Sequence, residues 1–280
     1  MLWRMQRIDA HQHFWIYEKE RHAWINDDMK SIQKDFMPTD LHPIFLKNSI
    51  DGCILVQVDQ TEEENNFQLN NSASYNFIKG IVGWVALQSP DVEERLQHYQ
   101  EHKKMKGFRH ILQGEKDRAH MLKPVFKHGI GLLNKYNYTY DILIYPDQLS
   151  NSYDLVSTFP DQRFVIDHIA KPDIKNRKIN DWKRDINQFK PCENVYCKIS
   201  GMVTEADWHN WKNQDFFPYI DVVVETFGTK RIMFGSDWPV CLVAASYEKM
   251  IGVVKRYFST FSKDEQNDFF GNNATRFYNL

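Results

Sequence analysis

Short strand-like runs alternate with helical segments along this sequence of 280 residues. Eight runs rich in β-branched and aromatic residues end at turn or helix signals. They cover residues 7–15, 52–60, 81–88, 106–112, 138–146, 163–172, 195–201 and 231–239. Helical periodicity fills most of the intervening segments, at 62–79, 91–104, 119–135, 148–159, 181–189 and 216–227. Because strands that alternate with helices form a parallel sheet, the pattern predicts an α/β fold.

Eight such units in a chain of this length favour a single TIM-like (β/α)8 barrel over residues 1–280 rather than an open, doubly wound sheet. The connection after the first run, about residues 16–38, is unusually long. A long loop after a barrel strand is commonly a lid, which we predict here. A helix is expected near residues 39–47, and Ser262 and Glu265 have the spacing of a capping box for a helix in the tail.

Composition and missing motifs exclude several classes of function. With 42% hydrophobic residues, 26% charged residues and a net charge of -2, the chain lacks the clustered positive charge of a nucleic-acid surface. Its first residues lack a signal-peptide core, and no run approaches the roughly 20 apolar residues of a membrane span. We therefore expect a cytoplasmic protein. The four cysteines form no C-x-x-C pair and are expected as buried thiols, and no glycine-rich nucleotide motif follows the first strand.

Four polar side chains stand near the ends of three predicted strands: His11 and His13 in the first, His168 in the sixth and Asp237 in the eighth. Residues i and i+2 of a strand share a face, and barrel active sites lie at the carboxyl ends of the strands. We expect these four to converge. Three imidazoles and a carboxylate could hold one divalent metal, most plausibly zinc. They could also work without metal, with Asp237 as general base and the histidines polarising a carbonyl.

Arg109 ends the fourth predicted strand, where its fork of donors suits a carboxylate or a pair of hydroxyls. We predict that it binds substrate. Its neighbour His110 points the other way and is expected to be structural. Aromatic side chains beside the predicted site are candidate pocket walls, namely Trp15, Trp24 and Tyr145.

Several motifs, taken in order, resemble the amidohydrolase superfamily and its amidohydrolase-2 branch of lactonases. They are Asp-Ala-His-Gln-His-Phe-Trp at 9–15, Gly-Phe-Arg-His at 107–110, Val-Ile-Asp-His-Ile-Ala-Lys-Pro at 165–172, Lys-Ile-Ser-Gly-Met at 198–202, Phe-Gly-Ser-Asp-Trp-Pro at 234–239 and Gly-Asn-Asn-Ala-Thr-Arg-Phe-Tyr at 271–278. The resemblance implies a barrel of the metallo-dependent hydrolase type. It also implies hydrolysis of a sugar-acid lactone, such as L-fuconolactone or L-rhamnonolactone, by water that Asp237 deprotonates.

Departures from the wider superfamily narrow the expected site. Arg109 stands where a bridging lysine would be, and Tyr145 ends a fifth strand that lacks a histidine. The resemblance therefore implies no metal requirement or a single divalent ion, not a two-metal site. Trp15, Trp24 and the segment 205–208 look like the sugar-lactone members.

Other readings of the sequence stay open. The substrate could instead be an aromatic-pathway lactone of the pyrone-dicarboxylate or muconolactone type. The chain could also be a zinc-dependent decarboxylase or a barrel that only binds a sugar acid. The sequence leaves a homo-oligomer possible, and the expected partner is a small-molecule lactone, with no nucleic acid and no membrane.

Overall fold

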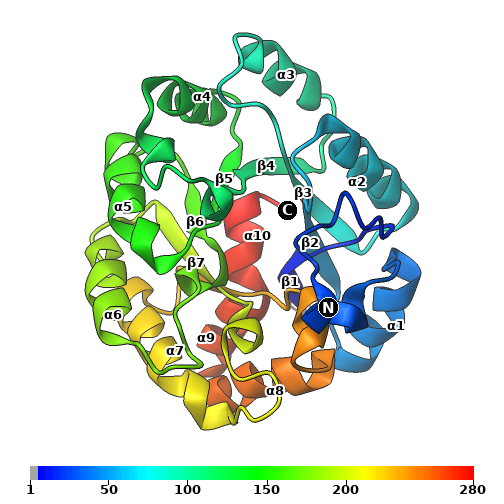
Figure 1. Cartoon of the computed structure of the whole chain (residues 1–280), viewed down its shortest axis with the longest axis vertical. Coiled ribbons are helices and arrows are strands. Elements are labelled where there is room, and N and C mark those ends of the chain that lie inside the picture. Colours follow the sequence, from blue (N-terminus) through cyan, green and yellow to red (C-terminus); the bar gives the residue numbers. More distant parts are fainter. Residues whose placement is uncertain (1–5) are drawn as a thin grey trace.

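The computed structural model describes residues 6–280, so the part of the predictions that rests on residues 1–5 lies outside it. Eight parallel strands pair in chain order and are surrounded by helices (Figure 1). The strands are β1 Ile8–Gln12, β2 Gly52–Val56, β3 Ile78–Gly83, β4 Met105–His110, β5 Thr139–Ile142, β6 Phe164–Ile166, β7 Val195–Ile199 and β8 Ile232–Phe234. The predicted (β/α)8 barrel is confirmed.

Eight helices follow the strands or lead into them, and two more follow in the tail. They are α1 Pro38–Asn48, α2 Glu62–Ser74, α3 Val92–Tyr99, α4 Pro124–Lys135, α5 Leu149–Thr158, α6 Asn180–Ile186, α7 Asn213–Phe227, α8 Tyr247–Tyr257, α9 Lys263–Asn267 and α10 Asn273–Tyr278. Apolar faces of this outer ring pack on the strands in one large core. Within residues 6–280, no helix has both the length and the apolar character needed to cross a membrane.

The predicted boundaries of strands and helices differ from the observed ones mainly at the carboxyl ends of these elements. The sixth run was expected to extend to residue 172, but β6 ends at Ile166 because four consecutive residues from His168 have positive φ. Helix α2 ends at Ser74 since Tyr75 is already extended, as the chain turns into β3. The predicted helix near residues 39–47 is α1, and the capping box of Ser262 and Glu265 opens α9.

Helix α10 closes the amino-terminal end of the barrel and lies across its centre in Figure 1. Ala274, Phe277 and Tyr278 pack inside the barrel against inward-facing residues of the strands. Two basic side chains at strand beginnings donate to backbone carbonyls near the end of α10: Lys106 to Asn279, at 2.8 Å, and Arg163 to Phe277. The opposite, carboxyl-terminal end of the barrel is left open.

The first connection, residues 16–38, folds back on itself above β1. The backbones of Trp15 and Phe36 exchange two hydrogen bonds, at 3.0 and 2.9 Å, and a short 3₁₀ helix covers Asp27–Ile32. Ile25, Ile32 and Phe36 are buried. The loop is therefore a packed element of the barrel's open end.

Candidate active site

A cavity of about 380 Å³ opens at the carboxyl ends of the strands. One part of its wall is apolar, formed by Trp24, Val58, Ile111, Leu143 and Val240. The other part is polar, formed by His13, Arg109, Gln113, His168, Lys171 and Asp237. Such a combination of apolar walls and a few convergent polar groups is typical of a small-molecule site.

His11 in β1 and His13 directly after it lie beside the seam where β1 meets β8, and His13 lines the cavity. The N–H of Asp237 donates to the carbonyl of His11 at 2.8 Å, and the N–H of His13 donates to that of Trp238 at 2.7 Å. Nδ1 of His13 lies 2.8 Å from the carbonyl oxygen of Val56. Since a carbonyl only accepts, neutral His13 carries its proton on Nδ1 and turns a lone pair on Nε2 toward the cavity.

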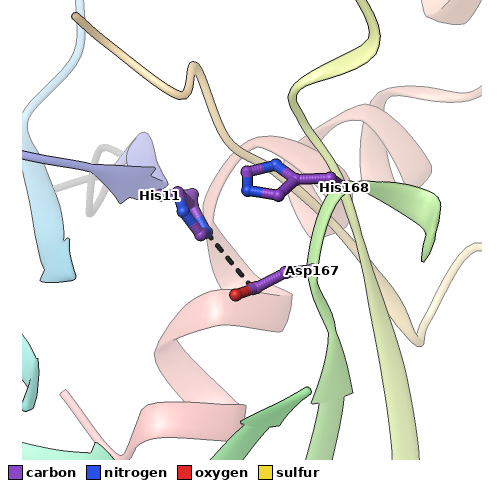
Figure 2. A group of neighbouring side chains, drawn as sticks. All are labelled: His11, Asp167 and His168. Atoms are coloured by element: carbon purple, nitrogen blue, oxygen red, sulfur yellow. Dashed lines mark hydrogen bonds and ion pairs between the residues drawn. The ribbon is translucent and has the colours of Figure 1, made fainter. Parts of the chain in front are cut away.

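His11 lies below His13 and is completely buried. Its Nδ1 lies 3.2 Å from Oδ1 of Asp167, while its Nε2 lies 3.3 Å from Nη1 of Arg109. The Lys198 ammonium also lies 3.2 Å from Nδ1, but the Arg109 donor at Nε2 and the Asp167 acceptor at Nδ1 together favour the same tautomer as in His13. Figure 2 shows the His11 ring facing Asp167, with the His168 ring beside them.

His168 follows β6 in a left-handed backbone conformation, with φ of 54°. Its Nδ1 lies 2.9 Å from Oγ of Ser200, a hydroxyl that can donate or accept, so either tautomer fits. The ring centroids of His11 and His168 are 4.3 Å apart. The position of the His168 ring also requires glycine at position 201. A Cβ there would lie 2.5 Å from Nδ1 of His168, and φ is +62°.

The carboxylate of Asp237 joins the three imidazoles. Its Oδ1 lies 3.3 Å from Nε2 of His13 and 3.9 Å from Nε2 of both His11 and His168. Asp237 is only 4% exposed but lines the cavity. The four residues predicted from the strand ends therefore lie together around one point.

Burial keeps two of these histidines neutral near pH 7. It lowers the pKa of both His11 and His168 well below the usual value for histidine, against the opposing charge of Asp167. Neutral imidazoles offer lone pairs or single N–H groups rather than positive charge. Positive charge in the cavity lining comes from Arg109 and Lys171.

Arg109 is held rigidly by protein acceptors on its outer nitrogens. Nη1 donates to Oδ2 of Asp167 at 3.0 Å, and Nη2 donates to the backbone and side-chain oxygens of Gln57. Its Nε is buried and has no hydrogen-bond partner among the described residues. A buried donor without a partner is costly, and a ligand oxygen in the cavity would satisfy it.

A charged network below the histidines was not predicted from the sequence. Lys198 of β7 is completely buried, 3.0 Å from Oδ1 of Asp167, and it also donates to Asp141 of β5. The hydroxyl of Tyr278 in α10 donates to Asp141 at 2.9 Å. Although burial acts to raise it, Lys198 and His11 hold the pKa of Asp167 well below its usual range. The signal in the sequence was a charged residue within each of two apolar strands.

Of the three aromatic residues predicted to form the cavity wall, only Trp24 lines the cavity. Trp24 is 43% exposed and lines the cavity. Trp15 is buried, packs edge-on against Trp24 with ring centroids 6.0 Å apart, and donates its indole N–H to the carbonyl of Lys34. Tyr145 is 41% exposed and lies under the ammonium of Lys171. Trp15 and Tyr145 therefore support neighbours that line the cavity.

The donor set fits one divalent metal ion. His11, His13 and Asp237 bring ligand atoms within 4.8 Å of one another, as do His11, Asp167 and His168. Oxygen partners at Nδ1 orient all three rings, and such second contacts are typical of metal-binding histidines. Three nitrogens and a carboxylate oxygen suit zinc.

Comparisons with known proteins show which family and which enzymes this chain is similar to. The model of a family described as amidohydrolase matches residues 8–280. An L-fucono-1,5-lactonase from Burkholderia multivorans is 34% identical, over 98% of this chain and 96% of its own length. An L-rhamnono-gamma-lactonase from Scheffersomyces stipitis is 26% identical, over 63% of this chain and 59% of its own.

Solved structures with a similar fold include amidohydrolases. A crystal structure of an amidohydrolase from Burkholderia multivorans with bound zinc has a TM-score of 0.95 and 34% identity, over 98% of this chain and 99% of the other. A 2,6-dihydroxybenzoate decarboxylase from Rhizobium has a TM-score of 0.69 and 14% identity over 99% of each chain. The second similarity shows a common fold only.

Proposed function

The chain belongs to the amidohydrolase family, and on that premise we propose that it is a hydrolase that opens the lactone ring of a sugar acid. The observation that carries this proposal is the placement of Asp237 against three imidazoles and Arg109 in a cavity of about 380 Å³. The similarity to an L-fucono-1,5-lactonase supports an aldonolactone as the substrate, with L-fuconolactone as the first choice.

In the proposed reaction Asp237 takes a proton from water, and the resulting hydroxide adds to the lactone carbonyl. The tetrahedral oxyanion then collapses, the bond from the carbonyl carbon to the ring oxygen breaks, and Asp237 returns the proton to that oxygen. The product is the open-chain sugar acid. One positioned base contributes about 10² to 10⁴ in rate, so stabilisation of the oxyanion must supply much of the remainder.

The tautomer of each histidine determines whether its Nε2 can accept or donate a hydrogen bond in the proposed reaction. Neutral His13 presents a lone pair at Nε2 to the cavity, which suits it to orient the attacking water through its hydrogens or to hold a metal, whereas Nε2 of His11 lies 3.3 Å from the Arg109 guanidinium. His168 can carry its proton on Nε2 and donate to the oxyanion, together with Nε of Arg109. A divalent metal held by the histidines and Asp237 would supply Lewis-acid polarisation of the carbonyl.

The remaining cavity residues suit a polyhydroxylated ring. Lys171 and Gln113 offer polar groups to hydroxyls, while Trp24 offers an aromatic face to ring C–H groups. Trp24 belongs to the loop at residues 16–38, which supports the proposal that this loop acts as a lid. The cytoplasmic location and a homo-oligomeric state stay predictions.

A pH-indicator assay on aldonolactones tests the function. The metal-stripped and zinc-reconstituted protein would be compared on L-fucono-, L-rhamnono- and other aldonolactones, and we expect acid release above the spontaneous rate. Muconolactone and pyrone dicarboxylate form a second panel, and CO2 release from dihydroxybenzoates a third. Activity confined to either of these panels would overturn the assignment to sugar lactones.

A further inference from the structure

A second group of potential metal ligands lies behind the wall of the cavity. It consists of His110, Glu115 and His120, which we call the 110–120 cluster, and their ligand atoms lie within 4.8 Å of one another. His110 is the outward-facing neighbour of Arg109 at the end of β4. The proposed reaction uses none of the three side chains.

The carboxylate of Glu115 connects the two histidines. One oxygen lies 2.7 Å from Nε2 of His110, and the other lies 3.3 Å from Nδ1 of His120. The two rings stack nearly parallel, with 11° between their planes, and both pack edge-on against Phe126 of α4. Ligand atoms bound tetrahedrally at about 2.0 Å from zinc are about 3.3 Å apart, which is close to both of the Glu115 contacts.

Nδ1 of His120 has two incompatible neighbours. The Glu115 carboxylate can only accept a hydrogen bond, whereas the Lys123 ammonium, 3.2 Å from the same nitrogen, can only donate one. A neutral imidazole nitrogen cannot satisfy both. Lys123 is 43% exposed and also pairs with Asp117 at 3.2 Å, so it can leave Nδ1 and keep a partner.

The protonation states of the other ligands are suitable. Burial lowers the pKa of His110, which is therefore neutral near pH 7. Partial burial acts to raise the pKa of Glu115, but His110 and His120 bring it below its usual value and keep the carboxylate ionised. Metal binding would need the His110 proton to move from Nε2 to Nδ1 and the His120 proton to lie on Nε2, where the side-chain amide of Gln88, 2.9 Å away, would turn its oxygen toward the ring.

We propose that His110, Glu115 and His120 form a second divalent-metal site, suited to zinc and separate from the site around Asp237. Two imidazoles and one carboxylate leave a fourth position for water, a ligand set that zinc commonly takes. Glu115 is partly exposed, so the ion can enter from solvent.

This site would control the shape of the cavity. The loop between His110 and His120 supplies Ile111, Gln113 and Gly114 to the cavity wall. An ion that joins both ends of this loop through Glu115 would fix that wall without touching the substrate. The cluster would thus be a structural metal site that supports substrate binding.

Zinc stoichiometry tests the proposal. Chelator-treated protein would be loaded with zinc, desalted, and its zinc measured with a chromogenic chelator after unfolding. The wild type is expected to hold one zinc per chain more than His120→Phe, which preserves ring packing, and one more than Glu115→Gln, which preserves shape. His128→Phe, which removes an exposed histidine of α4, should retain the wild-type content.

A thermal readout complements the stoichiometry. Zinc should raise the melting temperature of His13→Ala, a variant that removes one of the residues around Asp237, and should raise it less when His120→Phe is added. If Glu115→Gln and His120→Phe both retain the wild-type zinc content, the second site does not exist. Should His120→Phe fail to fold by circular dichroism, the shape-preserving Glu115→Gln decides alone.

Discussion

Oδ1 of Asp237 lies 3.3 Å from Nε2 of His13, the nitrogen that carries the lone pair when the ring is neutral. A carboxylate and a lone pair at this distance cannot bond to each other directly, because neither has a proton to donate. They can both contact one water molecule or one cation. In the proposed reaction, that shared contact is the attacking water.

Asp237→Asn should lower kcat for the lactone by about 10² to 10⁴, because the amide cannot take a proton from water. KM should change little, since the amide retains the shape of the side chain. Initial rates of acid release provide the measurement, with the exposed Asp161→Asn as the matched control. Near wild-type turnover in folded Asp237→Asn would rule out the proposed base.

Lys198→Met should destabilise the fold by about 3 to 5 kcal/mol, because it leaves the buried carboxylate of Asp141 without a cation and leaves Asp167 with Arg109 alone. Denaturant unfolding followed by tryptophan fluorescence measures this change. The double variant Lys198→Met/Asp141→Asn should recover part of the loss. Lys183→Met, on the exposed side of α6, serves as the control. Equal stabilities for the two lysine variants would contradict the network.

Arg21→Gln should loosen the loop at residues 16–38, which we propose as a lid. Arg21 donates to Asp59 at 2.8 Å and lies 3.6 Å from Glu64, so it ties the loop to the segment after β2. A partly exposed pair of this kind contributes up to about 1 kcal/mol, so KM should rise about two- to fivefold with kcat nearly constant. Lys19→Gln, on the same loop, should not change KM. An unchanged KM in Arg21→Gln would argue against the lid.

Glu64 should make stability fall as pH rises. Burial raises its pKa from 4.5 to about 7, so the folded protein holds a proton that the unfolded chain has released. Stability from this group is complete below pH 4.5 and is lost as pH rises through about 7, by up to about 3 kcal/mol. Urea unfolding between pH 4 and 8 measures the slope. Glu64→Gln should flatten it and the exposed Glu63→Gln should not; parallel slopes in all three proteins would contradict this.

The sequence predicted the convergence of His11, His13, His168 and Asp237 because barrel strands all end on one face. That rule requires only the order of the strands, which hydrophobic periodicity reveals. The same rule placed Arg109 at the cavity. The catalytic and metal-binding roles of these residues stay predictions until the variants are measured.

The buried ion pairs of Lys198 could not be predicted from the order of the strands. Asp141 lies in β5, Lys198 lies in β7 and Asp167 directly follows β6, so their pairing depends on the relative register of these three strands. A single sequence does not show that register. Trp15 was expected in the pocket wall, but the strand-like pairing with Phe36 buries it behind Trp24. Both the ion pairs and the burial of Trp15 depend on contacts between distant segments rather than on the local sequence pattern.

The seam between β1 and β8 has a consequence for how the enzyme acquires activity. The N–H of Ser236 donates to the Asp9 carboxylate across 227 residues of sequence, and the Asp237–His11 and Trp238–His13 bonds continue the same seam. Contacts this distant are entropically slow to form. Since the proposed base and two of its histidines come from opposite sides of the seam, catalysis cannot begin before the first and last strands meet. The rate at which activity returns during refolding would therefore report the rate at which β1 and β8 come together and close the barrel.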